Sequence, residues 1–120
     1  IQKMKHADAI VIGSPVYFAQ VTPEVKAFID RTGYLIRGNG KFLSRKIGAA
    51  VTVARRAGTL PAFNTINNYF LINEMIVPGS QYWNVGLAKE PGEIQSDDEG
   101  NRIVTRLAEN MLWLHKKIAR

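Results

Sequence analysis

The first third of the chain shows a strand pattern followed by a helix pattern. Residues 9–12 are apolar at every position and mostly β-branched, which is typical of a strand covered on both faces of a parallel sheet. We expect this strand to end before Pro15, because proline cannot donate a ladder hydrogen bond. Thr22 and Pro23 form a helix start, and apolar residues at three- and four-residue spacing predict a helix from Pro23 to about Gly33.

The alternation of strand and helix patterns continues to the carboxyl end. Residues 34–45 are rich in glycine and basic side chains, which predicts a mobile connection. The strand after it contains small residues, among them Gly48, that let a helix pack closely over it. The elements expected beyond the connection are a central strand over 46–53, a helix from Pro61 to about Asn73, a short strand at 76–77 and a helix over 101–120. This order predicts an α/β fold with right-handed crossovers between parallel strands.

Two loops follow the first two predicted strands. The loop over 14–20 carries Tyr17 and Phe18, and the loop over 55–58 carries two arginines and Gly58. Because parallel strands end at one edge of a sheet, where open α/β sheets bind ligands, the loops should face one cleft. Guanidinium groups suit a phosphate or the polar edge of a heteroaromatic ring, and glycine lets the backbone approach a flat ligand. The residues alone also allow aromatic rings that plug the core and a solvated basic turn.

The connection over 79–98 is longer than most loops of compact domains. It contains turn-forming residues, the aromatic pair Tyr82 and Trp83, and an acidic group at 97–99. Its length favours a functional or interface role. The two aromatic side chains are equally compatible with a loop anchored to its own core.

Composition narrows the chemistry that the chain can carry. The 120 residues have a formal net charge of +6 in small scattered groups, which favours anionic ligands, and the absence of a recognition motif argues against a nucleic-acid partner. There is no cysteine, so neither a disulfide nor a cysteine-ligated metal is expected within these residues. His6 and His115 are far apart in sequence, and we interpret both as surface residues rather than metal ligands.

The ends of the chain carry information on domain organisation. No apolar run is long enough to span a membrane and the first residues are polar, so we expect a soluble, cytoplasmic protein that does not bind a membrane. The chain begins at Ile1 and reaches its first strand within ten residues. Three strands alone would leave a buried-type strand at a sheet edge. We therefore expect residues 1–120 to be one domain that lacks an amino-terminal part.

Three segments together resemble a known family. They are SPVYFAQVTPEVKAFIDRT at 14–32, RRAG at 55–58 and NEMIVPGSQYWN at 73–84. The first resembles the flavin-facing loop and following helix of the flavodoxin-like NAD(P)H-dependent FMN reductases. The other two resemble most closely the iron–sulfur flavoproteins and their cluster-free relatives within that superfamily. The resemblance extends over residues 7–117.

The resemblance implies a fold, a cofactor and a set of contacts. The implied fold is the carboxyl-terminal part of a flavodoxin-like, doubly wound parallel sheet in three α/β/α layers, with its first strands and phosphate loop missing. FMN would lie at the carboxyl edge of the sheet and supply the redox chemistry, so no catalytic side chain and no metal ligand is expected. The residues that would border the isoalloxazine ring are Ser14, Pro15, Val16, Tyr17, Phe18, Arg55, Arg56, Ala57 and Gly58.

The implied activity is FMN-dependent electron transfer between NAD(P)H, or an iron–sulfur partner, and a quinone, free flavin or other small acceptor. A first alternative is an electron carrier with an iron–sulfur cluster in the missing segment. A second alternative is a flavin-free assembly module, because fold does not fix function. Related proteins complete the flavin site with a neighbouring subunit, so the resemblance also implies a homo-oligomer, a dimer or tetramer.

Two features depart from the family pattern. The hydroxyl- and glycine-rich loop that binds the FMN phosphate at a helix start is absent from these residues. The wider quinone-reductase group has a glycine pair followed by an acid in the second loop, whereas Gly58 here stands alone before Thr59. Because of this second difference, the nicotinamide contacts of the quinone-reductase group cannot be carried over directly to this sequence.

Overall fold

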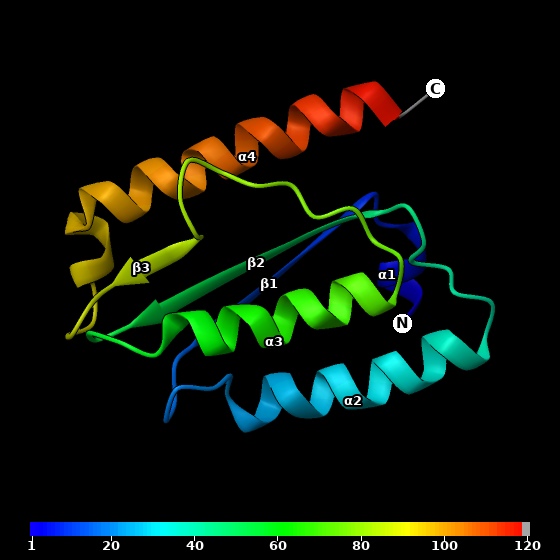
Figure 1. The fold of residues 1–120 in the computed structure, drawn as a ribbon, viewed down its shortest axis with the longest axis horizontal. Coiled ribbons are helices and arrows are strands. Elements are labelled where there is room, and N and C mark those ends of the chain that lie inside the picture. Colours follow the sequence, from blue (N-terminus) through cyan, green and yellow to red (C-terminus); the bar gives the residue numbers. More distant parts are fainter. Residues whose placement is uncertain (119–120) are drawn as a thin grey trace.

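The structure is a computed structural model that describes residues 1–118. Its centre is a parallel sheet with the strand order β1-β2-β3. Helices α2 and α3 cover one face of the sheet and α4 lies over the other, which gives three layers (Figure 1). The strands are β1 (Ala9–Pro15), β2 (Ile47–Ala54) and β3 (Val85–Leu87). The helices are α1 (Gln2–His6), α2 (Pro23–Gly38), α3 (Thr59–Ile72), α4 (Asp98–Ile118) and the 3₁₀ helix η1 (Glu93–Ser96). The predicted α/β fold is confirmed.

Strands β1 and β2 pair in parallel along the whole length of β1. The register runs from Ala9 opposite Ile47 to Pro15 opposite Val53. Our expected end of this strand, before Pro15, is therefore wrong. The backbone N–H of Val16 donates to the Val53 carbonyl oxygen at 2.9 Å, so the preceding nitrogen of Pro15 points away from β2. Its missing N–H costs no bond to β2, and the strand can include proline.

Helix α2 extends beyond the predicted end at Gly33 to Gly38. The Thr32 hydroxyl lies 2.6 Å from the Phe28 carbonyl oxygen and 2.9 Å from the Tyr69 hydroxyl of α3. Ile36, one turn further on, is fully buried in the core. Packing against α3 thus offsets the weak helix propensity of glycine. The predicted mobile connection over 34–45 is correspondingly wrong in its first five residues, which are helical.

The third strand lies later in the chain than we predicted. Ile76 forms only an isolated bridge with Ile47, and Pro78 follows without an N–H for further pairing. The third strand is instead β3, which pairs in parallel with Thr52–Ala54 at the end of β2. The segment over 79–98 is therefore not one irregular loop, because it contains both β3 and η1.

The core between the sheet and helices α2 and α3 depends on the small residues of β2. Ile36, Ile66 and Phe70 are fully buried, and they pack in one cluster with Ala50 of β2. A Cβ atom placed on Gly48 would lie 2.7 Å from Cγ of Phe70, well inside van der Waals contact. The predicted close approach of a helix over Gly48 is confirmed.

Replacement of Gly48 by alanine should therefore destabilise the protein. We expect Gly48→Ala to lower the free energy of unfolding by about 1–3 kcal/mol, because the added methyl group overlaps the Phe70 ring. Urea denaturation followed by circular dichroism measures the change. Gly38→Ala is the matched control, since nothing lies within 4 Å of its added Cβ atom. Equal stability of the two variants would contradict this account of the core.

Helix α4 begins earlier than the predicted start at Asn101, directly after Asp97. The carboxylate of Asp97 accepts hydrogen bonds from the backbone N–H of Gly100 at 2.9 Å and of Leu87 at 2.8 Å. These two bonds hold the pKa of Asp97 below its ordinary value and tie the helix start to β3. The predicted residues 119–120 of this helix lie outside the described residues. None of the helices described over residues 1–118 combines the length and apolar character needed to cross a membrane.

The Asp97 bonds predict a pH-dependent contribution to stability. A carboxyl group with a lowered folded-state pKa stabilises the fold above its unfolded pKa, near 3.9, and loses that contribution as the pH falls through the folded value. Asp97→Asn should therefore cost about 1 kcal/mol at pH 7, and the difference from the unsubstituted protein should shrink below about pH 4. Urea denaturation from pH 7 to pH 3 measures it. A difference that stays constant with pH would exclude an ionised Asp97 as the stabilising group.

Candidate functional site

The first predicted loop is a tight turn that displays its aromatic rings. The backbones of Tyr17 and Gln20 exchange hydrogen bonds of 2.9 and 3.0 Å, and the two residues between them have positive φ values, 48° at Phe18 and 60° at Ala19. Phe18 is fully exposed and Tyr17 is 56% exposed. The interpretation in which these rings plug the core is therefore wrong. The turn presents an aromatic surface to solvent at the end of β1.

Ser14 supports this turn from inside. Its side chain is buried, and its hydroxyl donates to the Pro15 carbonyl oxygen at 2.8 Å and accepts from the Thr22 N–H at 3.1 Å. The Thr22 hydroxyl in turn accepts from the Val25 N–H at 3.3 Å and caps α2. The Ser14 hydroxyl is thus occupied by the chain itself, and it links the end of β1 to the start of α2.

The second predicted loop packs directly against the first. Gly58 has a φ of 88°, and a Cβ atom placed on it would lie 3.0 Å from the Ala19 Cα and 3.1 Å from a methyl carbon of Val16. Both loops lie at the end of the sheet to which β1 and β2 point (Figure 1). The structure therefore brings the nine predicted residues to one edge, five at the end of β1 and in its turn and four in the loop after β2.

The second loop has unused hydrogen-bond donors. Within residues 1–118, none of the four backbone N–H groups of Arg55–Gly58 has a hydrogen-bond partner. Arg55 and Arg56 are exposed, and neither forms an ion pair with another described residue. Gly58 keeps the loop close to the Tyr17 turn, because a larger residue would collide with it. The edge thus offers a group of N–H donors beside exposed aromatic rings.

A cleft of about 390 Å³ opens beside the second loop, along the outer edge of β3. We call it the β3 cleft. The amino ends of α3 and α4 lie at the same end of the sheet as the tip of β3 (Figure 1). The residues that line the β3 cleft are Arg56, Thr59, Leu60, Tyr82, Trp83, Val85, Leu87, Asp97, Glu99, Gly100 and Ile103.

The aromatic pair Tyr82 and Trp83 forms one wall of the β3 cleft. The rings meet edge to face, with centroids 4.7 Å apart and planes at 65°. They are 55% and 49% exposed, so the loop is not anchored by burying them in the core. The sequence marked these two residues, but it did not place them in one cleft with Arg56. That placement required the position of β3, which sequence patterns missed.

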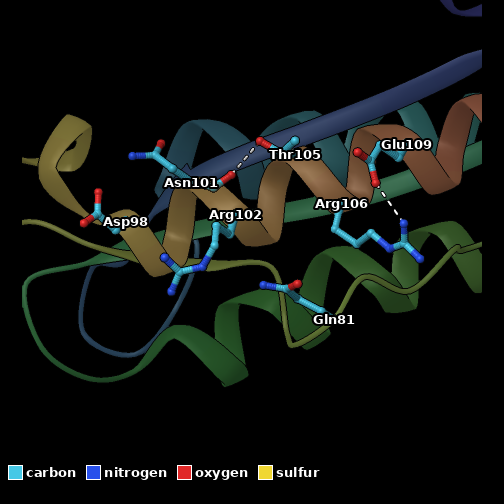
Figure 2. Close-up of a pocket in the computed structure, with 7 residues that line it drawn as sticks. All are labelled: Gln81, Asp98, Asn101, Arg102, Thr105, Arg106 and Glu109. Carbon is cyan, nitrogen blue, oxygen red and sulfur yellow. Dashed lines mark hydrogen bonds and ion pairs between the residues drawn. The ribbon is translucent and has the colours of Figure 1, made fainter.

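A second cleft, of about 430 Å³, lies along α4 and is polar. Figure 2 shows Arg102 and Arg106 on α4 and Gln81 on the neighbouring loop, with Arg106 paired to Glu109. The Arg106 guanidinium lies 2.9 Å from the Glu109 carboxylate. None of the nine predicted site residues lines it. A lining of charged and amide side chains suits a flat apolar ring poorly. We therefore place the candidate site at the two loops rather than here.

A metal centre has no support among the described residues. Residues 1–118 contain no group of three or more His, Asp or Glu side chains arranged to hold a metal ion. The residues gathered at the sheet edge are instead aromatic, guanidinium and backbone N–H groups. This donor set fits a flat heteroaromatic ring with carbonyl oxygens at its rim.

Comparison with known proteins identifies flavoproteins among the similar sequences. The chain is 37% identical over 125 aligned residues to an iron-sulfur flavoprotein of Methanocaldococcus jannaschii, covering 98% of this chain and 64% of the relative. It is 29% identical to an NAD(P)H dehydrogenase (quinone) of Trichlorobacter lovleyi, covering 68% of this chain and 40% of that protein. The chain thus spans less than two thirds of the length of these relatives.

A solved structure shares the fold at low sequence identity. A flavodoxin, WrbA-like protein from Agrobacterium tumefaciens superimposes with a TM-score of 0.68 at 15% identity, covering 91% of this chain and 71% of the other. This similarity shows that the sheet and its helices have the flavodoxin-like arrangement. Residues 1–90, which include both loops at the sheet edge, match the family model described as NADPH-dependent FMN reductase. The chain therefore belongs to the NADPH-dependent FMN reductase family.

Proposed function

We propose that the two loops bind the isoalloxazine ring of FMN, and that the protein is an FMN-dependent oxidoreductase. Electrons would pass between NAD(P)H, or an iron–sulfur partner, and a quinone, free flavin or other small acceptor. The observation that carries the proposal is the contact between the Tyr17 turn and the Arg55–Gly58 loop at one sheet edge. Membership in the FMN reductase family supports the same cofactor.

The residues of the site fit a flavin in a specific way. The free N–H groups of Arg55–Gly58 can donate to the carbonyl oxygens of the pyrimidine edge, and the arginines can stabilise negative charge there. Tyr17 and Phe18 offer exposed aromatic surface for the ring system. When bound, FMN supplies the redox chemistry, and the chain orients the ring and sets its electrostatic environment. No side chain of the site is required as a general base.

The phosphate of FMN would be bound elsewhere in the whole protein. The two loops hold no hydroxyl- and glycine-rich segment at a helix start, which is the usual phosphate site. We therefore propose the two loops as the site of the flavin ring and not of the phosphate. A flavin without a phosphate is then the proper probe for residues 1–120.

Titration with riboflavin, which lacks the phosphate, tests the proposed ring site directly. Saturable quenching of riboflavin fluorescence is expected on addition of the protein. Tyr17→Ala and Arg55→Ala should each raise the dissociation constant about tenfold, because they remove an aromatic contact and a charged donor. Isothermal calorimetry of the same variants checks the fluorescence values.

Two matched controls separate the site from general effects. Tyr34→Ala removes an exposed tyrosine of α2, and Arg31→Ala removes an exposed arginine of the same helix. Both should leave the dissociation constant unchanged. If the protein binds neither riboflavin nor FMN, or if the loop variants bind as tightly as the controls, the proposed function is wrong and the flavin-free module is favoured.

A further inference from the structure

Gln20 closes the Tyr17 turn and is not among the residues proposed to border the flavin. Its backbone N–H and its carbonyl oxygen both bond to Tyr17, at 3.0 and 2.9 Å. Its side chain reaches further, because the amide oxygen Oε1 accepts from the Thr65 hydroxyl of α3 at 2.9 Å. The same oxygen accepts from the Val21 N–H at 3.0 Å. One side-chain oxygen thus connects the turn both to the segment that leads into α2 and to α3.

The two donors assign the orientation of the Gln20 amide. A backbone N–H can only donate, so the atom that faces Val21 is the amide oxygen and not the amide nitrogen. The Thr65 hydroxyl then donates its proton to the same oxygen. Val21 itself is buried in the core, so the backbone next to Gln20 is held in place. The bond to Thr65 therefore joins α3 to a fixed point of the chain.

The backbone of the Tyr17 turn is strained and needs support at its ends. Phe18 and Ala19 have φ values of 48° and 60°, in the left-handed region, which costs free energy for residues other than glycine. Phe18 is fully exposed, so packing of its ring in the core does not offset this cost. Such a backbone persists only where the surrounding structure holds it. The bonds of Gln20 supply that support at the second end of the turn.

Helix α3 is a common support of both loops. It begins at Thr59, directly after Gly58 of the second loop, and it also carries Thr65. A Cβ atom placed on Gly58 would lie 3.0 Å from the Ala19 Cα, so the turn and the second loop are in contact. The bond between Gln20 and Thr65 holds the turn to the helix that continues from this loop. Loss of the bond would therefore free the turn to move away from the second loop.

We propose that Gln20 and Thr65 are positioning residues of the flavin site, and that their bond holds the Tyr17 turn against the Arg55–Gly58 loop before the ring binds. Neither side chain is required to touch the flavin. A turn that already has its binding shape loses less conformational freedom on binding, so the bond contributes to affinity by preorganisation. This inference rests on the proposed function, since it names the residues that position one wall of that site.

Amide hydrogen exchange in the ligand-free protein tests the support of the turn without any flavin. Thr65→Val removes the donor to Gln20 and leaves the Val21 bond intact. The amide protons of Tyr17 and Gln20, which bond to each other's carbonyl oxygens, should then exchange about fivefold faster. Thr65→Ser keeps a hydroxyl and should restore the slow exchange. Unchanged exchange in Thr65→Val would overturn the proposal.

Thr105→Val is the matched control. The Thr105 hydroxyl bonds to the Asn101 carbonyl oxygen one helical turn back at 2.8 Å, and the Thr65 hydroxyl likewise lies 3.1 Å from the Pro61 carbonyl oxygen. Both substitutions remove such a contact within a helix, but only Thr65 bonds to the Tyr17 turn. Thr105→Val should therefore leave the exchange of the turn amides unchanged. Equally fast exchange in both valine variants would reflect a general loss of stability and contradict the proposal.

Riboflavin titration of the same variants measures the effect on the site. Thr65→Val and Gln20→Leu should each raise the dissociation constant about fivefold, whereas Thr65→Ser and Thr105→Val should bind like the unsubstituted protein. The double variant should bind no more weakly than Gln20→Leu alone, because the bond between the two side chains is then already lost. Losses of affinity that add in the double variant would show that the two side chains act independently.

The two measurements together separate this inference from the proposed function. If the unsubstituted protein binds riboflavin and Thr65→Val binds it equally well, the positioning role is rejected and the flavin site stands. If the turn amides respond to Thr65→Val but no protein of the series binds riboflavin, the proposed function is rejected, and the positioning role is rejected with it.

Discussion

The parallel pairing of β1 with β2 is the constraint on which the rest of the structure depends. The register from Ala9–Ile47 to Pro15–Val53 makes both strands end at the same level, and the Val16–Val53 hydrogen bond carries the pairing into the first loop. The turn at Tyr17 and the loop at Gly58 consequently meet. A shift of the register would separate the loops and turn the side chains of β1 to the opposite face of the sheet.

Asp97 holds two elements together at the other side of the sheet, as the β1–β2 pairing does for the two loops. Its two carboxylate oxygens bind the N–H of Leu87 in β3 and the N–H of Gly100 in α4, so one side chain joins a three-residue strand to the last helix. Because such a short strand has few backbone bonds of its own, this connection positions the outer wall of the β3 cleft. The shape of the cleft and the stability of the α4 start are thus coupled.

Sequence patterns predicted the parts of the structure that depend on local chemistry. The apolar run at 9–12, the Thr22–Pro23 helix start and the loops after the first two strands are each formed by consecutive residues. The structure confirms their order and the common edge of the two loops. Features that depend on distant contacts were missed. Helix α2 continues because Ile36 packs in the core and Thr32 bonds to Tyr69 of α3. Strand β3 forms because the Val85–Leu87 segment pairs with the end of β2. Periodicity carries no signal for either contact.

A single nuclear magnetic resonance titration tests the central claim, that the two loops form one flavin site. Backbone amide signals of Val16–Phe18 and Arg55–Gly58 should shift together as riboflavin is added, and both sets should follow one binding curve with one dissociation constant. Amides at the opposite end of the sheet, near Ala9 and Ile47, should not move. Shifts confined to one loop, or two loops that saturate at different concentrations, would contradict the account.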